Sequence, residues 1–185
     1  SAKGIEISSA SASLSQISIN TSGSDSYGLL LLSGSLYNII NNFLITTSGI
    51  NSIGMFLTTG SSSNNISGSS VVTTGASSHG FYITGSSSNI ISQSSINTSG
   101  TGSFGAYLLY SGSETVLSNV SIITSGAGAN GVDIYSSNNN NLSDLSIITR
   151  NTGYGINIYS GSENTVIKNP NIITNSSVIM DTTGD

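Results

Sequence analysis

The chain has 185 residues, a net charge of −5 and no cysteine, and charged residues make up only 6% of it. Three cations (Lys3, Arg150 and Lys168) are too few for a surface that neutralises nucleic-acid phosphates. The lack of cysteine excludes disulfides and thiolate metal sites, and no apolar run approaches the roughly 18 residues of a membrane-spanning helix.

A surface of serine, threonine, asparagine and glycine must replace the missing charges. Such a surface offers proteases few basic residues, and it suits an exposed, durable location. We therefore expect the protein to be extracellular or attached to a cell surface.

A glycine followed by an alternating apolar run recurs along the whole chain. These runs begin at Gly4, Gly28, Gly54, Gly80, Gly105, Gly131 and Gly155, so successive steps are 24, 26, 26, 25, 26 and 24 residues. A repeat of this length is typical of a solenoid, in which each coil packs only against its neighbours. We expect residues 1–185 to form one continuous domain.

Each repeat contains three short strand patterns separated by turns of serine, glycine and asparagine. The first, or glycine, strand alternates inward apolar residues such as Leu29 and Leu31 with outward ones. The second is short and begins with asparagine or threonine, at Asn38, Asn65, Asn89, Thr115, Asn141 and Thr165. The pattern of the third strand predicts one inward column of aliphatic residues, which contains Ile45, Val72, Ile96 and Ile122. It also predicts an inward threonine ladder at Thr21, Thr47, Thr74, Thr98, Thr124, Thr149 and Thr174.

Three strands in each repeat of about 25 residues predict an all-β fold, a right-handed parallel β-helix of about seven coils. A partial last coil is expected near Val178-Ile179-Met180. Strands of one kind should stack about 4.8 Å apart as three parallel sheets around one core. The recurrent glycine either has a positive φ or lies at a corner where a Cβ would clash.

The last full repeat carries a resemblance to a known family. The stretch Gly155-Ile-Asn-Ile-Tyr-Ser-Gly-Ser-Glu-Asn-Thr-Val-Ile-Lys-Asn-Pro-Asn-Ile-Ile resembles the parallel β-helix repeat of the pectin-lyase-like superfamily. It is also similar to repeats of nitrous-oxide-reductase accessory proteins and of large microbial surface proteins. The resemblance implies the β-helix fold, but not one activity, because the repeat occurs in lyases, hydrolases, adhesins and stalks.

The catalytic groups of the polysaccharide enzymes in this superfamily have no counterpart in the pattern. The resemblance implies that such an enzyme would need clustered aspartates, or a calcium ion bound by carboxylates together with a basic residue. Asp133 faces outward between Tyr107 and Asn157 with no second carboxylate beside it, and Glu114 and Glu163 fall at one turn position two coils apart. We predict no catalytic residue and therefore no enzyme.

Metal and cofactor sites are not predicted either. His79 is the single histidine, Arg150 has no acidic partner that the sequence can name, and the two methionines are scattered. Copper chemistry of the accessory-protein kind would need clustered histidine, methionine or cysteine. We expect no cofactor.

Two outward stripes are apolar. The first stripe follows the glycine strands and contains Leu30, Phe56, Tyr82 and Tyr107, flanked by Leu32, Leu109, Tyr135 and Tyr159. The second stripe follows the third strands, where the outward residues change from Asn20, Thr46, Thr73 and Asn97 to Ile123, Ile148 and Ile173. Such stripes are typical of cross-strand ladders, of subunit interfaces or of glycan-stacking platforms. The sequence leaves these three interpretations open.

We expect a non-catalytic structural protein: a subunit of an extracellular filament, sheath or surface layer, or an adhesin stalk. The open ends of a β-helix predict a head-to-tail homo-oligomer through Ile5 and Ile7 at one end and Val178 and Met180 at the other. The alternative is a polysaccharide-binding or polysaccharide-degrading module that uses the aromatic stripe. Ice binding is disfavoured because the outward threonines are irregular.

Overall fold

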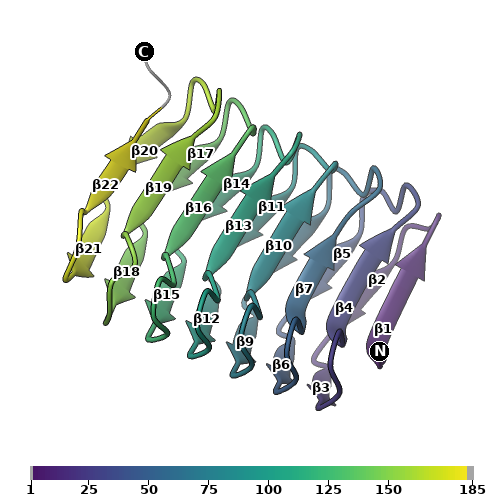
Figure 1. Cartoon of the computed structure of the whole chain (residues 1–185). Coiled ribbons are helices and arrows are strands. Elements are labelled where there is room, and N and C mark those ends of the chain that lie inside the picture. Colours follow the sequence, from purple (N-terminus) through teal and green to yellow (C-terminus); the bar gives the residue numbers. More distant parts are fainter. Residues whose placement is uncertain (1, 183–185) are drawn as a thin grey trace.

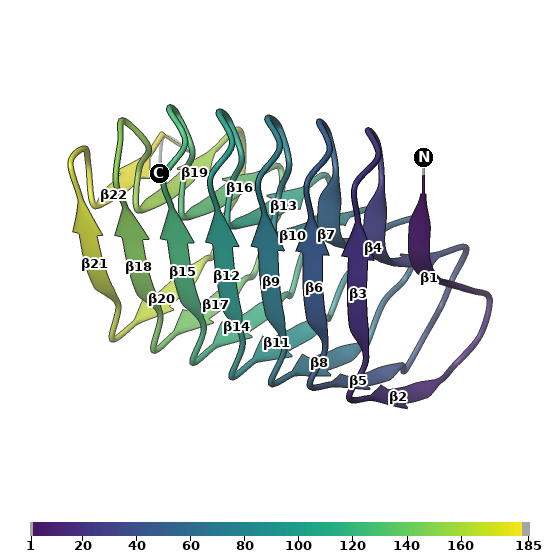
Figure 2. The same cartoon turned by 90° about the horizontal axis from the view of Figure 1, so that it is seen from below.

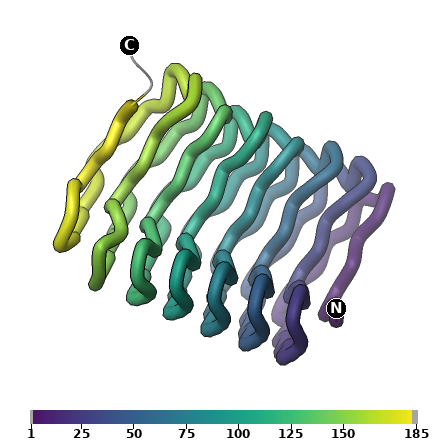
Figure 3. The backbone as a smooth tube through the Cα atoms, viewed as in Figure 1, coloured from purple at the N-terminus to yellow at the C-terminus, as the bar shows by residue number. Residues whose placement is uncertain are grey.

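The computed structural model describes residues 2–182, which form a right-handed parallel β-helix (Figures 1 and 3). Each strand pairs in parallel with the corresponding strand one coil away, and the described residues contain strands and turns but no helix. No helix that could cross a membrane is therefore found in this range. The two chain ends lie at opposite ends of the solenoid (Figure 1).

The glycine sheet, in the foreground of Figure 1, has eight strands because it includes the partial last coil. Its members are β1 (Lys3–Ser8), β4 (Tyr27–Leu32), β7 (Ile53–Leu57), β10 (Phe81–Thr84), β13 (Ala106–Leu109), β16 (Val132–Tyr135), β19 (Ile156–Tyr159) and β22 (Ile179–Asp181).

The other two sheets have seven strands each. The second sheet contains β2 (Ser13–Ser15), β5 (Ile39–Asn41), β8 (Asn65–Ser67), β11 (Ile90–Ser92), β14 (Val116–Ser118), β17 (Asn141–Ser143) and β20 (Val166–Lys168). The third sheet, in front in Figure 2, contains β3 (Ser18–Thr21), β6 (Leu44–Thr47), β9 (Ser70–Thr73), β12 (Ser95–Thr98), β15 (Ser121–Thr124), β18 (Ser146–Thr149) and β21 (Asn171–Thr174). The predicted three strands per coil and about seven coils are confirmed.

The recurrent glycine is required by close packing and not by a positive φ. A Cβ on Gly54 would lie 2.1 Å from Val71 Cγ1 and 2.7 Å from the carbonyl oxygen of Gly80. The residues with positive φ lie in turns instead, as at Asn42 (56°) and Asn119 (53°) between the second and third sheets. The steric alternative for this glycine is confirmed.

The third strand of the third coil has a register different from the predicted one. Val71 and Thr73 are buried, whereas Val72 and Thr74 are outward, so the inward file runs through Ile45, Val71, Ile96 and Ile122. The prediction of Val72 and Thr74 as inward, and of Thr73 as outward, was wrong. Doubled residues (Val-Val and Thr-Thr) satisfy alternation in either register, so the pattern could not distinguish them.

Two of the second strands begin at Asn65 and Asn141, as predicted. The asparagines that precede them, Asn64 and Asn140, are buried. Asn64 belongs to a buried asparagine ladder, in which Asn38 Nδ2 donates to Asn64 Oδ1 at 2.8 Å and Asn64 Nδ2 donates to Asn89 Oδ1 at 3.1 Å. This ladder satisfies the buried side-chain amides of Asn38 and Asn64, whereas Asn89 Nδ2 at its end makes no hydrogen bond within the described residues.

Where the buried threonines of the third sheet donate a hydrogen bond, they donate it to backbone and not to one another. Thr73, Thr98 and Thr124 each donate from Oγ1 to a carbonyl oxygen five residues later, at 2.6 to 2.8 Å. Thr21 and Thr47 make no such bond within the described residues. The threonine column thus closes the turn into the next glycine strand in coils three to five.

The last strand also differs from its predicted orientation. Ile179 pairs with Ile156 and continues an inward file, while Met180 pairs with outward Asn157. The end-contact prediction of Met180 is therefore replaced by Ile179, which is 42% exposed; Val178 is 50% exposed. At the opposite end Ile5 and Ile7 pair with the inward residues Leu29 and Leu31.

Candidate functional site

The outer face of the glycine sheet gathers most of the aromatic side chains. Its central column follows the ladder register and contains Glu6, Leu30, Phe56, Tyr82, Tyr107, Asp133, Asn157 and Met180. A second column contains Leu109, Tyr135 and Tyr159. The residues that precede the strand glycines, including Tyr27, His79 and Phe104, form a third.

The rings of the central column stack on one another. Ring centroids are 4.9 Å apart between Phe56 and Tyr82 and 5.1 Å apart between Tyr82 and Tyr107, with interplanar angles of 17° and 12°. Rings this close can be nearly parallel only when they face each other, so each ring covers its neighbour. Leu30, predicted to be exposed, is outward but only 5% exposed.

His79 is held among these rings. Its centroid lies 5.0 Å from that of Phe104 and 5.2 Å from that of Tyr107, and its Nδ1 accepts the backbone N–H of Phe104 at 3.0 Å. Burial lowers the pKa of His79 to about 4. The imidazole is therefore neutral at pH 7, and its Nε2 carries the proton.

This shift predicts a pH-dependent stability. A histidine whose folded pKa lies below its unfolded value of 6.5 stabilises the fold fully above pH 6.5, and this stability is lost as the pH falls toward about 4. At the acid end of that window we expect a loss of about 3 kcal/mol from this group. Asp133, whose pKa is raised, contributes with the opposite sign.

The measurement is urea unfolding between pH 7 and pH 4 for the wild type and for His79→Asn. Asn130 occupies the equivalent position two coils later, and its Oδ1 accepts the Tyr154 N–H at 2.8 Å, so asparagine is a matched replacement. We expect the variant to lose less stability than the wild type on acidification. If the free energies of unfolding of the two proteins fall in parallel with pH, the assignment of the acid-induced loss of stability to His79 is wrong.

Asp133 interrupts the aromatic column and is 1% exposed. Its Oδ2 accepts hydrogen bonds from the side-chain amides of Asn130 and Asn157, the latter at 3.0 Å. Its Oδ1 is buried and has no hydrogen-bond partner at normal distance. The Tyr159 hydroxyl nevertheless lies near enough to interact with the carboxyl group.

Burial raises the pKa of the Asp133 carboxyl, and the amides of Asn157 and Asn130 and the Tyr159 hydroxyl partly oppose this shift. Burial and the nearby Asp133 carboxylate also raise the pKa of Tyr107 to about 12, and the pKa of Tyr159 rises for the same two reasons. Both tyrosines are therefore neutral hydroxyl groups at pH 7. The hydroxyl groups of Tyr107 and Tyr159 also interact with each other across Asp133.

The sequence predicted the position of Asp133 but not its burial. It assumed that an outward side chain on a sheet is exposed to water, whereas here side chains from the neighbouring coils cover it. The aromatic residues one coil on either side, Tyr107 and Tyr159, were the signal that could have indicated a covered carboxylate. Asn130 and Asn157 as its donors were not recognised.

The stripe on the third sheet is a simple column. Ile123, Ile148 and Ile173 pair in register, and Ile173 is 60% exposed while the other two are partly covered. A cavity of about 370 Å³ beside it is lined by residues that include Val72, Asn97 and Arg150. The structure leaves this stripe separate from the aromatic face on the glycine sheet.

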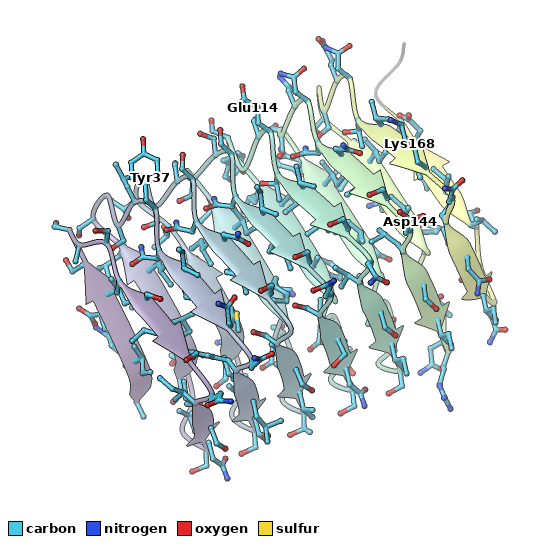
Figure 4. All side chains as sticks on the ribbon, turned by 180° about the vertical axis from the view of Figure 1, so that it is seen from behind. Tyr37, Glu114, Asp144 and Lys168 are labelled. Atoms are coloured by element: carbon cyan, nitrogen blue, oxygen red, sulfur yellow. The ribbon has the colours of Figure 1, made fainter. Side chains whose placement is uncertain are left out.

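The remaining acids do not converge. Figure 4 shows Glu114, Asp144 and Lys168 projecting outward from different places on the solenoid. Glu114 aligns with Asn139 and Asn164, so Glu163 lies one residue out of its column and the predicted shared position was wrong. Within residues 2–182, no group of three or more histidine, aspartate or glutamate side chains could hold a metal ion.

Comparison with known proteins gives a family and one distant structural likeness. The family model described as right-handed beta helix region matches residues 45–185. The A-module of Azotobacter vinelandii mannuronan C-5 epimerase AlgE4 is 14% identical, with a TM-score of 0.33 over 91% of this chain and 63% of that chain. No curated protein sequence matches the chain. A likeness this distant carries no information about activity.

Proposed function

The chain belongs to the family of right-handed β-helix regions, and from this premise we propose that its function is structural: a non-catalytic, extracellular β-solenoid that stacks end to end in a filament, sheath or surface layer. The observation that carries the proposal is the pair of open edges. Among the described residues, β1 and β22 pair on one side only, and inward residues such as Ile179 and Ile172 are partly exposed there. Unpaired strand edges of this kind associate readily.

The geometry of stacking is set by the first and last strands, which both belong to the glycine sheet. A second copy placed beyond β22 would pair its β1 with β22 and continue the glycine sheet in parallel, while β20 and β21 would lie two coil steps from that copy's β2 and β3. Each aliphatic side chain that it covers contributes about 1.5–3 kcal/mol before the entropic cost of association. The two ends differ, so the contact is head to tail and propagates.

The aromatic face supports the same proposal. Its central rings are covered by one another, so they bind successive coils together and leave no flat row of open ring faces. The cavity of about 400 Å³ between the second and third sheets is lined by serine, glycine and amide side chains with Asp144 and Val120, and no aromatic residue. Neither feature requires a small-molecule substrate.

Electron microscopy of the purified protein tests the proposal. We expect filaments whose subunits continue along the solenoid axis, and we expect the variant Ile5→Lys, at a partly buried position, to remain folded but monomeric because it places a charge in the contact. The matched control is Ser13→Lys, with the same charge added on an outward position of the adjacent second-sheet strand. A wild-type protein that stays monodisperse by light scattering at high concentration would contradict assembly.

The second candidate function is glycan binding by the glycine sheet. Tyr135 and Tyr159 are partly exposed, and their ring centroids lie 4.9 Å apart with the planes inclined by 65°. A monomeric protein that binds oligosaccharides on an array, with affinity lost in Tyr135→Ala, would favour this candidate.

A further inference from the structure

Asp133 is the feature of the outer face that neither stacking nor packing explains. The chain has only eight acidic residues, and this one is almost fully buried in the middle of an aromatic face. Burial of a carboxylate is costly unless a partner compensates it. A leucine or tyrosine at this position, as in the coils before it, would continue the column without that cost.

The compensation within the chain is incomplete. Oδ2 has two amide donors, while Oδ1 has no hydrogen bond at normal distance, and the only other polar group that acts on the carboxyl is the Tyr159 hydroxyl. No cationic side chain contributes to the electrostatics of the carboxyl group. Among the described residues, the one ion pair joins Lys3 to Glu6, and both lie on β1, at the far end of the same sheet. The carboxylate therefore lacks a positive partner.

Aromatic residues surround this carboxylate. Tyr107 stacks on Tyr82 with one ring face, and its opposite face points along the axis toward β16, where the column holds Asp133 instead of another ring. Tyr135 lies on the same strand as Asp133, and Tyr159 lies on the next. Ring faces attract cations, most strongly when water is excluded.

We propose that Asp133, Tyr107, Tyr135 and Tyr159 form a binding site for the primary ammonium group of a small organic molecule, such as an alkylamine or an unacetylated amino sugar. An ammonium N–H donates to Asp133 Oδ1, and the carbon skeleton of the ligand lies against the face of Tyr107 that is turned toward β16. Tyr159, which bridges Asp133 and Tyr107 in the closed site, turns outward to admit the ligand. The site is independent of end-to-end assembly.

The chemistry selects against other ligands. A uronate or phosphate would meet an uncompensated negative charge, and no cationic side chain of the cluster offsets it. A neutral sugar would satisfy the hydrogen bond to Oδ1 but not the charge. Since the carboxylate and the rings favour the same ligand charge, ammonium ions are the class that the cluster fits.

The test is titration at low ionic strength with n-butylammonium and with D-glucosamine, followed by NMR of the tyrosine ring signals. N-acetyl-D-glucosamine, which lacks the ammonium charge, is the control ligand. We expect saturable shifts of the Tyr107 and Tyr159 signals at millimolar concentrations of both amines. Tighter binding of D-glucosamine than of n-butylammonium would identify an amino sugar as the ligand class, and equal binding would identify a simple alkylamine.

The variant Asp133→Asn keeps the size of the side chain and removes its charge, and we expect it to bind the amines at least tenfold more weakly. The matched control is Asp25→Asn, which removes one charge at an exposed turn and should bind as the wild type does. Absence of saturable shifts, equal binding of N-acetyl-D-glucosamine, or undiminished binding by a folded Asp133→Asn protein would each overturn the proposal.

Discussion

The variant Ile96→Asp is expected to lose about 4 kcal/mol or more of its free energy of unfolding. Ile96 is 2% exposed and pairs with Val71 on one side and Ile122 on the other, both of which are buried. An aspartate there would have no cation or amide donor within the aliphatic file. Urea unfolding followed by circular dichroism measures the loss.

The matched control is Asn97→Asp, one residue further along β12, where the side chain is exposed. It introduces the same charge on the outer face and should change stability by less than about 0.5 kcal/mol. Equal stabilities of the two variants would mean that the inward register of the third sheet is wrong.

The same comparison in the preceding coil tests the corrected register. Val71→Asp should unfold the protein, whereas Val72→Asp should be tolerated because Val72 lies on the outer face. The sequence alone predicted the reverse. Two identical residues in succession remove the only local signal that distinguishes inward from outward, and the register is then fixed by the fit of the whole coil to its neighbours.

Most of the architecture could be predicted because each coil repeats the same constraints. The spacing of Gly28, Gly54 and Gly80 sets the coil length, and the close approach of the next coil explains why glycine recurs there. The alternation of Leu29 and Leu31 sets the inward face. Where the chain broke this pattern, as at Val71-Val72, the prediction was one residue out.

The candidate site was less predictable because it depends on where long side chains turn after leaving the sheet. Register placed Tyr107 and Asp133 side by side, as expected. Whether Tyr159 reaches across to cover Asp133 depends on its rotamer, which alternation does not specify. The burial of Asp133, and the neutral state of His79, follow from those orientations.

The mutual stacking of Phe56, Tyr82 and Tyr107 also changes the interpretation of the stripe. In sequence, a row of aromatic residues one coil apart fits a sugar-binding platform and a structural ladder equally well. The centroid distances of about 5 Å show that Phe56, Tyr82 and Tyr107 stack as a ladder, and this favours the structural interpretation of these three rings. Asp133 interrupts the column, and so the row ends where the proposed ammonium site begins.

Gly100→Ala is expected to destabilise the protein by about 3 kcal/mol or more, although it adds a single methyl group. A Cβ on Gly100 would lie 1.8 Å from the carbonyl oxygen and 2.4 Å from the carbonyl carbon of Gly75, in the turn of the preceding coil. Both contacts are with backbone, so no rotamer change relieves them. The two coils must separate, and the hydrogen bonds that join these turns then lengthen or break.

The matched control is Gly102→Ala, two residues along the same turn, where no atom lies within 4 Å of the added Cβ. Its cost is conformational, about 1–2 kcal/mol, because Gly102 has a φ of 63° that alanine adopts reluctantly. Thermal and urea unfolding of the two variants should therefore place Gly100→Ala well below Gly102→Ala in stability. The reverse order would mean that the turns of adjacent coils are not in close contact and that glycine is retained there for its backbone conformation.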